Sequence, residues 1–425
     1  MTDSAGIRDG AGAAGGSGTP PRGRRRRLLR WIGLGLVLLV MAGAAAGWWV
    51  YAKLDGNITE DTSAEAELRR YERERPAHFG TGVQNILLIG SDSRSGRANS
   101  RYGQDAGTQR SDTAILLHLP ADRRSATAVS IPRDLMTRIP SCLKEDGSRT
   151  GERFAQFNWA FQWGGAACTI RTVERLTGIR IDHHMVVDFG GFKEMVDAVG
   201  GVEVCLERPV VDEEARLKLP AGRQLLRGEQ ALGFVRARYG LGDGSDTERM
   251  ERQQQFLGSL VKKVQSNGVL LNPTRLYPVL DAATSSVTTD PGLASLRGLY
   301  ELVRGVRDIP TDQVKFLTVP RRPYAADPNR DELMEPDATR LFRQLRMDRP
   351  LTVTSPQPPP RTDPEPDPEP RTRPLDPSPK DTGPATAPGR TAASEGAEPT
   401  GTGSAVPPVP VPTFTGTTAA EARCR

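Results

Sequence analysis

The chain has 425 residues and a formal net charge of +5, and this length allows two or more domains. Proline and glycine are concentrated towards its two ends, which excludes one folded core over the whole length. Arginine outnumbers lysine by 49 to 8. This bias fits the genome of a high-GC actinobacterium. Within a folded part it also fits a need for forked donors that bind carboxylates and phosphates.

The first two segments predict a tail and a membrane helix. Residues 1–30 are rich in glycine, alanine and arginine without an apolar period, so we predict a disordered cytoplasmic tail. The next 22 residues, 31–52, carry no charge, and as a helix they would span about 33 Å, enough to cross a bilayer. By the positive-inside rule, the arginines before this run keep the N-terminus cytoplasmic and place the rest outside. They are Arg22, Arg24, Arg25, Arg26, Arg27 and Arg30.

A cleaved signal peptide is the alternative to a membrane-spanning helix. It would end near Ala44, Ala45 and Ala46, a small-residue site of the kind that signal peptidases cleave. We favour the spanning helix because the apolar run continues past this site through Trp48 and Trp49, which are typical of a membrane interface. The chain is therefore predicted to be a single-pass membrane protein.

Three further segments follow along the chain. Residues 53–81 are polar and compatible with a helix, and we interpret them as a stalk. Residues 82–347 have the pattern of a globular domain. Residues 348–425 are rich in proline, threonine, glycine and alanine, a composition that predicts a disordered tail.

Short apolar runs alternate with helical patterns inside the globular part. We predict strands at 84–90, 113–119, 126–131, 184–189, 202–206 and 314–319, and helices at 166–176, 189–199, 228–234, 246–265 and 293–306. Strands interleaved with helices predict an α/β layered fold. A single sequence leaves the order of the strands open.

The cysteines fit an exported domain. Cys142 and Cys168 lie in a loop-rich stretch, and a disulfide between them is our preferred pairing, although spacing alone does not fix connectivity. A zinc site is the weaker alternative because no CxxC motif or suitably spaced histidine pair accompanies them. Cys205 lies in the predicted strand 202–206 and is interpreted as a buried thiol, and Cys424 falls in the tail.

Charged residues stand at the ends of the predicted strands. Asp92 follows the strand 84–90 in the sequence GSDSR, and Arg110 and Asp112 precede the next strand in RSDT. Arg133 follows the strand 126–131 in IPRD. Sites of α/β proteins tend to lie at strand ends, so these four residues are candidate site residues.

A second group of candidates lies further along the chain. Arg236 and Arg238 in FVRAR would share a face if this segment were extended. A capping-box sequence starts a helix at about Asp246, and Arg249 and Gln253 are neighbours on one side of it. Arg249 falls in the first turn, where anions are favoured.

The two groups together indicate a phosphate ligand. Several guanidinium groups in one place repel each other unless they share an anion, and a diphosphate takes bidentate hydrogen bonds from arginine. Asp92 and Asp112 supply the oxygen ligands with which proteins hold Mg²⁺ together with substrate phosphates. Taken alone, an Arg–Asp neighbour pair is usually a solvated ion pair, worth under about 1 kcal/mol.

Other chemistries have little support in the sequence. The serines are not in a GxSxG motif, and neither GxxxxGK[ST] nor HExxH occurs. The arginines before the membrane helix are explained by topology, so we predict no nucleic-acid partner.

The ordered set of motifs resembles the LytR-CpsA-Psr family of cell-envelope proteins. The resemblance extends from about residue 82 to 266, and more weakly to 347. It rests on NILLIGSDSR, RSDTAILLHL, SIPRD, FNWAF, GGFKEMVDAVGGVEV, GEQAL, VRAR and ERQQQF, after a basic tail and one membrane span. It implies an extracytoplasmic α/β domain with a central mixed sheet flanked by helices, and an apolar pocket for a polyprenyl chain.

The resemblance also implies roles for individual residues. Asp92 and Asp112 match the family's metal ligands for Mg²⁺, or Mn²⁺ in its place. Six residues match positions that hold the diphosphate, and of these Arg110 and Arg133, with Asp112, are taken as catalytic. The diphosphate-binding set is Arg110, Arg133, Arg236, Arg238, Arg249 and Gln253.

The implied activity is the transfer of a glycopolymer from undecaprenyl diphosphate to peptidoglycan, with release of the polyprenyl phosphate. The partners would be the polyprenyl-diphosphate-linked glycan, the peptidoglycan acceptor and the membrane. Two alternatives stay open: a pyrophosphatase of lipid carriers, and a membrane regulator that binds lipid without turnover. No motif names the glycopolymer.

Overall fold

The computed structural model describes residues 22–92, 111–237, 246–266, 273–355 and 411–421. Its centre is a nine-stranded mixed sheet in the order β1-β12-β7-β2-β3-β4-β13-β17-β16. These strands are β1 (Thr59–Glu60), β2 (Gln84–Ser91), β3 (Ser111–Leu119), β4 (Ala126–Ile131), β7 (His183–Asp188), β12 (Val287–Thr289), β13 (Val314–Thr318), β16 (Thr352–Thr354) and β17 (Thr413–Thr418). The expected α/β fold with a central mixed sheet is confirmed.

Four smaller antiparallel pairs surround this sheet in the described part of the chain. They are β5 (Met136–Ile139) with β6 (Arg153–Gln156), β8 (Val202–Leu206) with β11 (Gly222–Leu226), β9 (Val210–Asp212) with β10 (Leu217–Leu219), and β14 (Arg321–Tyr324) with β15 (Asp327–Leu333). All six strands predicted from the sequence are present.

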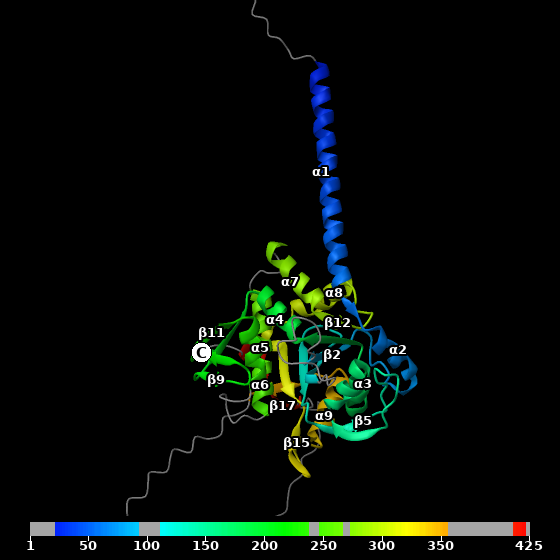
Figure 1. Ribbon diagram of the computed structural model, residues 1–425, viewed down its shortest axis with the longest axis vertical. Helices are drawn as coiled ribbons and strands as arrows, with labels where there is room; N and C mark the ends of the chain where they lie inside the picture. The colour runs from blue at the N-terminus through cyan, green and yellow to red at the C-terminus, as the bar shows by residue number, and fades with distance from the viewer. Residues whose placement is uncertain (1–21, 93–110, 238–245, 267–272, 356–410, 422–425) are drawn as a thin grey trace, which may run out of the picture.

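The helices are α1 (Arg22–Asn57), α2 (Thr62–Arg70), α3 (Trp159–Thr177), α4 (Phe189–Ala198), α5 (Gly228–Arg236), α6 (Asp246–Ser266), α7 (Pro273–Ser285), α8 (Leu296–Arg307) and α9 (Asp337–Arg346). The five predicted helices correspond to α3, α4, α5, α6 and α8. α1 is long and apolar enough to cross a membrane, and it extends away from the domain with α7 and α8 at its foot (Figure 1).

Both faces of the central sheet are covered, which explains the continuous apolar runs of its strands. Successive side chains of a strand point to opposite faces. Leu87 accordingly joins a core with α2, α3 and α9, and its neighbour Ile86 joins a core with α6 and α8. A third core lies between α4, α5, α6 and the strands β8 to β11.

One disulfide closes the region between β5 and α3. Cys142 and Cys168 are bonded, with Cα atoms 5.5 Å apart, so the preferred pairing is confirmed. α3 is kinked at Gly164 and Gly165. A Cβ atom at Gly164 would lie 2.8 Å from the carbonyl oxygen of Leu143 and 2.9 Å from Cβ of Cys168, so this close approach requires glycine.

The interpretation of Cys205 as a buried thiol is wrong. Cys205 is exposed and disulfide-bonded. The period of the strand explains this, because Val202, Val204 and Leu206 of β8 point into the core and the residues between them point outwards.

The ends of the domain differ from the predicted boundaries. The expected stalk, residues 53–81, contributes β1 to the sheet and α2 to the core, where Ala64 and Leu68 are buried. The expected tail, residues 348–425, contributes β16 and β17, and β17 pairs antiparallel with β13. The folded part is therefore wider in sequence than 82–347.

Candidate functional site

Several strands of the central sheet end or begin at one common edge, which we name the carboxyl edge. β2 and β7 run parallel, β3 is antiparallel to β2 and to β4, and β13 is parallel to β4. The carboxyl edge therefore collects the ends of β2, β7, β4 and β13 and the beginning of β3. In open α/β sheets this is the edge at which ligands bind.

The two predicted metal ligands come from adjacent strands at the carboxyl edge. The pairing of β2 with β3 shifts between Gly90 and Ser91, where Asp112 is the extra residue of a β-bulge. Ser91 pairs with Ser111, so Asp92 and Asp112 each directly follow a residue of that pair. Bulges are common next to active sites, where they redirect a side chain.

Arg133 lies just after β4 at the same edge. Its backbone oxygen accepts a hydrogen bond from the backbone N–H of Asn158 (3.0 Å), which fixes the turn. Its Nε lies 3.2 Å from Oδ2 of Asp134 and 3.8 Å from Oδ1 of Asp246. About a fifth of its side chain is exposed (20%), so part of this side chain is open to solvent.

A second guanidinium reaches the same carboxylate oxygen. Nη2 of Arg249, in the first turn of α6, lies 2.6 Å from Oδ1 of Asp246. The Arg249 side chain is only 6% exposed. Arg133 and Arg249 thus converge on one oxygen, although 115 positions separate them in the sequence.

The next turn of α6 connects this pair to Arg236. Nε2 of Gln253 donates to the backbone oxygen of Val235 (3.0 Å), in the last turn of α5. Arg236 ends α5, and its guanidinium carbon lies 4.5 Å from the ring centre of Phe189, the residue that follows β7. This is a cation–π contact. It places Arg236 beside the end of a strand at the carboxyl edge.

The condition under which Arg236 and Arg238 would share a face, an extended FVRAR segment, is not met at Arg236. This residue is the last of helix α5. Arg110 and Arg238 lie outside the described residues. The roles of the site residues in metal and diphosphate binding stay predictions.

Sequence reasoning missed a group of counter-ions beside Arg133. Oδ1 of Asp134 accepts a hydrogen bond from Nε2 of Gln156 (2.7 Å) and lies 3.3 Å from Nη1 of Arg330. Arg321 forms an ion pair with Asp331 in the neighbouring β14–β15 hairpin. Arg321 lies in the sequence RRP and Asp331 in the sequence DELM. Neither matches a known motif, and nothing in the sequence signals their pairing.

The acids of this group influence each other. Burial raises the pKa of Asp331 above its ordinary value, and the ion pair with Arg321 opposes this shift. The nearby carboxylates Asp246 and Asp134 raise the pKa further. The arginines at the carboxyl edge are therefore balanced by carboxylates of the protein itself, a possibility that the sequence argument for a shared external anion left out.

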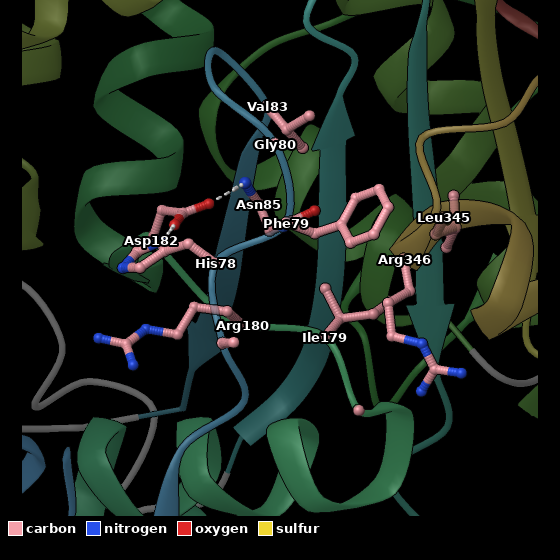
Figure 2. A pocket seen from close by; sticks show the side chains of 12 residues that line it. His78, Phe79, Gly80, Val83, Asn85, Ile179, Arg180, Asp182, Leu345 and Arg346 are labelled. Atoms are coloured by element: carbon pink, nitrogen blue, oxygen red, sulfur yellow. Dashed lines mark hydrogen bonds and ion pairs between the residues drawn. The ribbon is translucent and has the colours of Figure 1, made fainter. Parts of the chain in front are cut away.

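Two surface pockets lie away from the carboxyl edge. One is lined by His78, Asn85, Asp182 and Arg180 at the beginning of β2 and β7, where Asp182 accepts a hydrogen bond from the backbone N–H of Asn85 (2.8 Å; Figure 2). The other adjoins it and is lined by residues of α2, of the segment after it, and of the beginning of β2 and β7. None of the predicted site residues lines either pocket. The expected apolar pocket for a polyprenyl chain stays a prediction.

Asp92 and Asp112 at the carboxyl edge remain the predicted ligands of Mg²⁺. Within the described residues, no group of three or more His, Cys, Asp or Glu side chains is arranged to hold a metal ion. Asp92 and Asp112 are two carboxylates at neighbouring positions, and Mg²⁺ is usually bound through one or two carboxylates plus phosphate oxygens. The donor set is thus suited to a metal that arrives with a phosphate ligand.

Comparison with known proteins identifies the family. The model of the LytR_cpsA_psr family matches residues 51–345. The chain belongs to this family. The matched range and the folded domain both begin before residue 82, where the motifs begin. The motifs therefore cover only part of the family domain.

Curated relatives of this LytR-CpsA-Psr protein are cell-wall proteins. "Probable cell wall biosynthesis protein LcpB" of Corynebacterium glutamicum is 39% identical over 236 residues, 54% of this chain and 54% of that protein. The chain thus spans about half the length of that relative. "Polyisoprenyl-teichoic acid--peptidoglycan teichoic acid transferase TagT" of Bacillus subtilis is 27% identical over 308 residues, 69% of this chain and 88% of that protein.

Solved structures share the fold. The crystal structure of Bacillus subtilis TagV superposes with a TM-score of 0.50 at 24% identity, and the match covers 64% of this chain and all of TagV (100%). The protein gbs0355 of Streptococcus agalactiae gives a TM-score of 0.51 at 23% identity over 64% of this chain and 89% of that protein.

Proposed function

We propose that this protein is a membrane-anchored phosphotransferase that moves a glycopolymer from a polyprenyl diphosphate, such as undecaprenyl diphosphate, to peptidoglycan. Polyprenyl phosphate is released. Family membership and the names of the relatives support the class of reaction. The observation that carries the proposal is the convergence of Arg133 and Arg249 on one oxygen of Asp246 at the carboxyl edge.

This convergence prepares a place for a diphosphate. Asp246 lies at the N-terminal end of α6, where helix dipole and backbone N–H groups favour an anion. A phosphate oxygen that replaced its carboxylate as the partner of Arg133 would keep the same charge balance. Because Arg133 is the more exposed of the two arginines, it would contact the ligand, and Arg249 would hold the arrangement from behind.

The reaction exchanges one ester of phosphorus for another. A muramic acid hydroxyl of peptidoglycan attacks the phosphorus that carries the glycan, and a phosphodiester forms. The bond from this phosphorus to the bridging oxygen breaks, and polyprenyl phosphate leaves with the electron pair while the hydroxyl loses its proton. Arg133, Arg249 and Arg236 would stabilise the charge that develops on the leaving phosphate, by electrostatics and positioning.

Magnesium would add to this charge stabilisation. Asp92 and Asp112 would hold it, and when bound it would neutralise phosphate oxygens as a Lewis acid. Mn²⁺ has similar preferences for oxygen ligands.

Reconstitution tests the proposal directly. The full-length protein in detergent is mixed with a polyprenyl-diphosphate-linked glycan, isolated peptidoglycan and Mg²⁺. Mass spectrometry of the digested wall then measures phosphodiester-linked glycan, and released polyprenyl phosphate is quantified in parallel. We expect both products in equal amounts, and a loss of about 100-fold in Arg133→Ala, as is typical when one charge-stabilising group is removed.

The alternatives give different products. Polyprenyl phosphate together with free glycan phosphate, independent of peptidoglycan, would indicate a pyrophosphatase. Tight lipid binding without any product would indicate a non-catalytic regulator. Either result overturns the proposed transfer.

A further inference from the structure

The end of α1 is packed into the domain and does not lead into a flexible connection. Trp48 and Trp49 are 72% and 64% exposed, as expected for residues that face lipid, and Tyr51 is 44% exposed. Leu54, three residues later, is 2% exposed. The helix therefore passes from a lipid-type surface into a protein core within one turn, without a break in its hydrogen bonding.

Two side chains on one face of α1 bind α7. Nζ of Lys53 donates to the hydroxyl of Tyr277 (2.8 Å) and lies 3.1 Å from Oδ1 of Asp281. One turn later, Nδ2 of Asn57 donates to the same Asp281 oxygen (3.0 Å) and lies 3.4 Å from Oγ1 of Thr284, which is fully buried. We name these five residues the juxtamembrane clamp.

The order of these contacts shows that α1 and α7 run parallel. Moving back along α1 from Asn57 to Lys53 corresponds to moving back along α7 from Thr284 to Tyr277. α7 begins at Pro273, one helical turn or about 6 Å before Tyr277. Its first turn is thus level with Trp49, at the predicted boundary of the membrane, and Figure 1 shows α7 rising beside the lower part of α1.

A second contact fixes α1 from another side. The backbone N–H of Leu296, the first residue of α8, donates to Oδ1 of Asp55 (2.8 Å). Contacts with two helices in different directions restrain the tilt of α1 as well as its position.

The juxtamembrane clamp lies close to the carboxyl edge. α7 leads into β12, whose Val287 pairs with Val187 near the end of β7. Gly191 in the first turn of α4 packs directly against Ser286, because a Cβ atom there would lie 2.6 Å from the Ser286 side chain. Phe189, which contacts Arg236, begins the same turn of α4.

We propose that α7 is a second membrane-contacting element: its first turn lies in the lipid headgroup layer, and its clamp on α1 holds the carboxyl edge at a fixed height above the bilayer. The partner is the phospholipid surface that surrounds α1. This inference rests on the proposed function and on α1 spanning the membrane. A fixed height matters because a lipid-linked diphosphate presents its headgroup at one depth only.

A depth measurement tests the membrane contact without any activity. A nitroxide label on Leu276→Cys, in full-length protein reconstituted into vesicles of phosphatidylglycerol and phosphatidylethanolamine, reports accessibility to oxygen and to a water-soluble nickel chelate. The same label on Tyr51→Cys marks the interface, and on Arg223→Cys it marks a distant exposed surface. The parent protein, labelled in parallel, supplies the background.

We expect the Leu276 label to resemble the Tyr51 label, with nickel accessibility reduced at least threefold relative to the Arg223 label. Accessibility equal to that of the Arg223 label overturns the membrane contact of α7. This outcome is independent of whether the protein transfers a glycopolymer.

A charge exchange tests the positioning role. Lys53→Glu breaks the ion pair with Asp281. Adding Asp281→Lys restores an ion pair of reversed polarity between positions 53 and 281. The Asn57 amide is able to turn its oxygen towards the new lysine, so Asn57 tolerates the exchange. Transfer is measured with substrate embedded in vesicles and with substrate dispersed in detergent. The matched control is Arg223→Glu, which breaks the exposed pair of Arg223 with Glu203.

Lys53→Glu is expected to lower the vesicle-to-detergent activity ratio at least threefold, and the double variant to recover most of it. The control variant leaves the ratio unchanged. An equal loss in both formats, or an unchanged ratio, overturns the positioning role. Absence of transfer in the parent protein in both formats rejects the proposed function instead, and the depth measurement then decides on α7 alone.

Discussion

At Arg249 the shape of the cation matters as well as its charge. The side chain is buried, and it holds Asp246 at the start of α6. Arg249→Lys keeps the charge but loses the planar fork that arginine offers to carboxylate or phosphate. We expect transfer to fall about 10-fold to 100-fold, which corresponds to the loss of one charge-assisted hydrogen bond of about 1.5 to 3 kcal/mol. Initial rates with the lipid-linked glycan measure this.

The control for this substitution is Arg304→Lys on α8. Arg304 is 64% exposed and pairs with Glu301 in the preceding turn, so its substitution tests the same chemical change on a solvated surface. We expect no change in rate. Equal rates for Arg249→Lys and the parent protein would remove Arg249 from the site.

Asp61 follows β1, caps the N-terminus of α2, and makes stability depend on pH. Burial acts to raise its pKa, but the His184 ring, whose Nε2 lies 3.5 Å from Oδ2, and hydrogen bonds from the Ala64 backbone N–H and the Ser63 hydroxyl outweigh burial and lower the pKa to about 2, from 3.8. The folded state therefore holds its proton less tightly than the unfolded state. The resulting stabilisation, about 2 kcal/mol, is present above pH 3.8 and is lost as the pH falls towards 2.

Asp61→Asn removes the negative charge but keeps the helix cap, because asparagine is also a good N-cap residue for α2. Urea unfolding should give a difference of about 2 kcal/mol between the parent protein and Asp61→Asn at pH 7, and roughly half of that at pH 3. Asp61→Ala also loses the cap, which adds about 1 kcal/mol at every pH. A difference between parent and Asp61→Asn that stays constant from pH 7 to pH 3 would contradict the assigned pKa.

At the scale of elements, the C-terminal strand gives a stability prediction. Phe414 of β17 is 7% exposed and belongs to the core beneath α3 and α9. Phe414→Ala should lower the free energy of unfolding by about 3 kcal/mol, the lower end of the range for a buried phenylalanine. Val411→Ala, 44% exposed and just before the strand, should change it by less than about 0.5 kcal/mol. Equal stability of the two variants would show that β17 is not part of the core.

Strands with strong apolar runs were predictable, and β17 was not. β4, ATAVSI, is buried along its whole length, and hydrophobicity alone marks it as a strand. β17 has the sequence TFTGTT, with only Phe414 as a large apolar residue, and it follows a long proline-rich segment. Its place depends on pairing with β13, a contact about 100 positions away that no local pattern encodes.

The candidate site divides in the same way. Asp92, Asp112 and Arg133 were identifiable because strand ends are visible in the sequence and the sheet gathers them at one edge. Asp246 lies in the predicted first turn of a helix, but its ion pairs with Arg133 and Arg249 depend on the tertiary fold. Sequence position shows which charges are available, and the structure shows which of them neutralise each other.

For the whole molecule, the folded domain is assembled from segments that the composition separates. The part after α1 that was expected to be a stalk supplies β1, and the part that was expected to be a tail supplies β16 and β17 at the opposite edge of the sheet. Domain boundaries predicted from hydrophobicity therefore made the folded domain too short. Short edge strands need few apolar residues when the neighbouring strand is already buried.

The orientation across the membrane is the last prediction, and it concerns the whole chain. The six arginines from Arg22 to Arg30 precede the apolar run, and the positive-inside rule keeps them in the cytoplasm. In spheroplasts of cells that carry the protein with a tag at each end, antibody should reach the C-terminal tag directly and the N-terminal tag only after permeabilisation. Both tags should remain on one chain in the membrane fraction after an alkaline wash.

Each alternative changes one of these results. A cleaved signal peptide would separate the N-terminal tag from the mature chain, and an inverted orientation would expose that tag in intact spheroplasts. Replacing Arg24, Arg25, Arg26 and Arg27 with glutamate should lower the fraction of chains in the predicted orientation, because the charge bias that sets it is then reversed. Replacing Arg304 and Arg307, which lie far beyond the span, should leave the orientation unchanged, since charges beyond about 15–20 residues from a membrane helix contribute little to it.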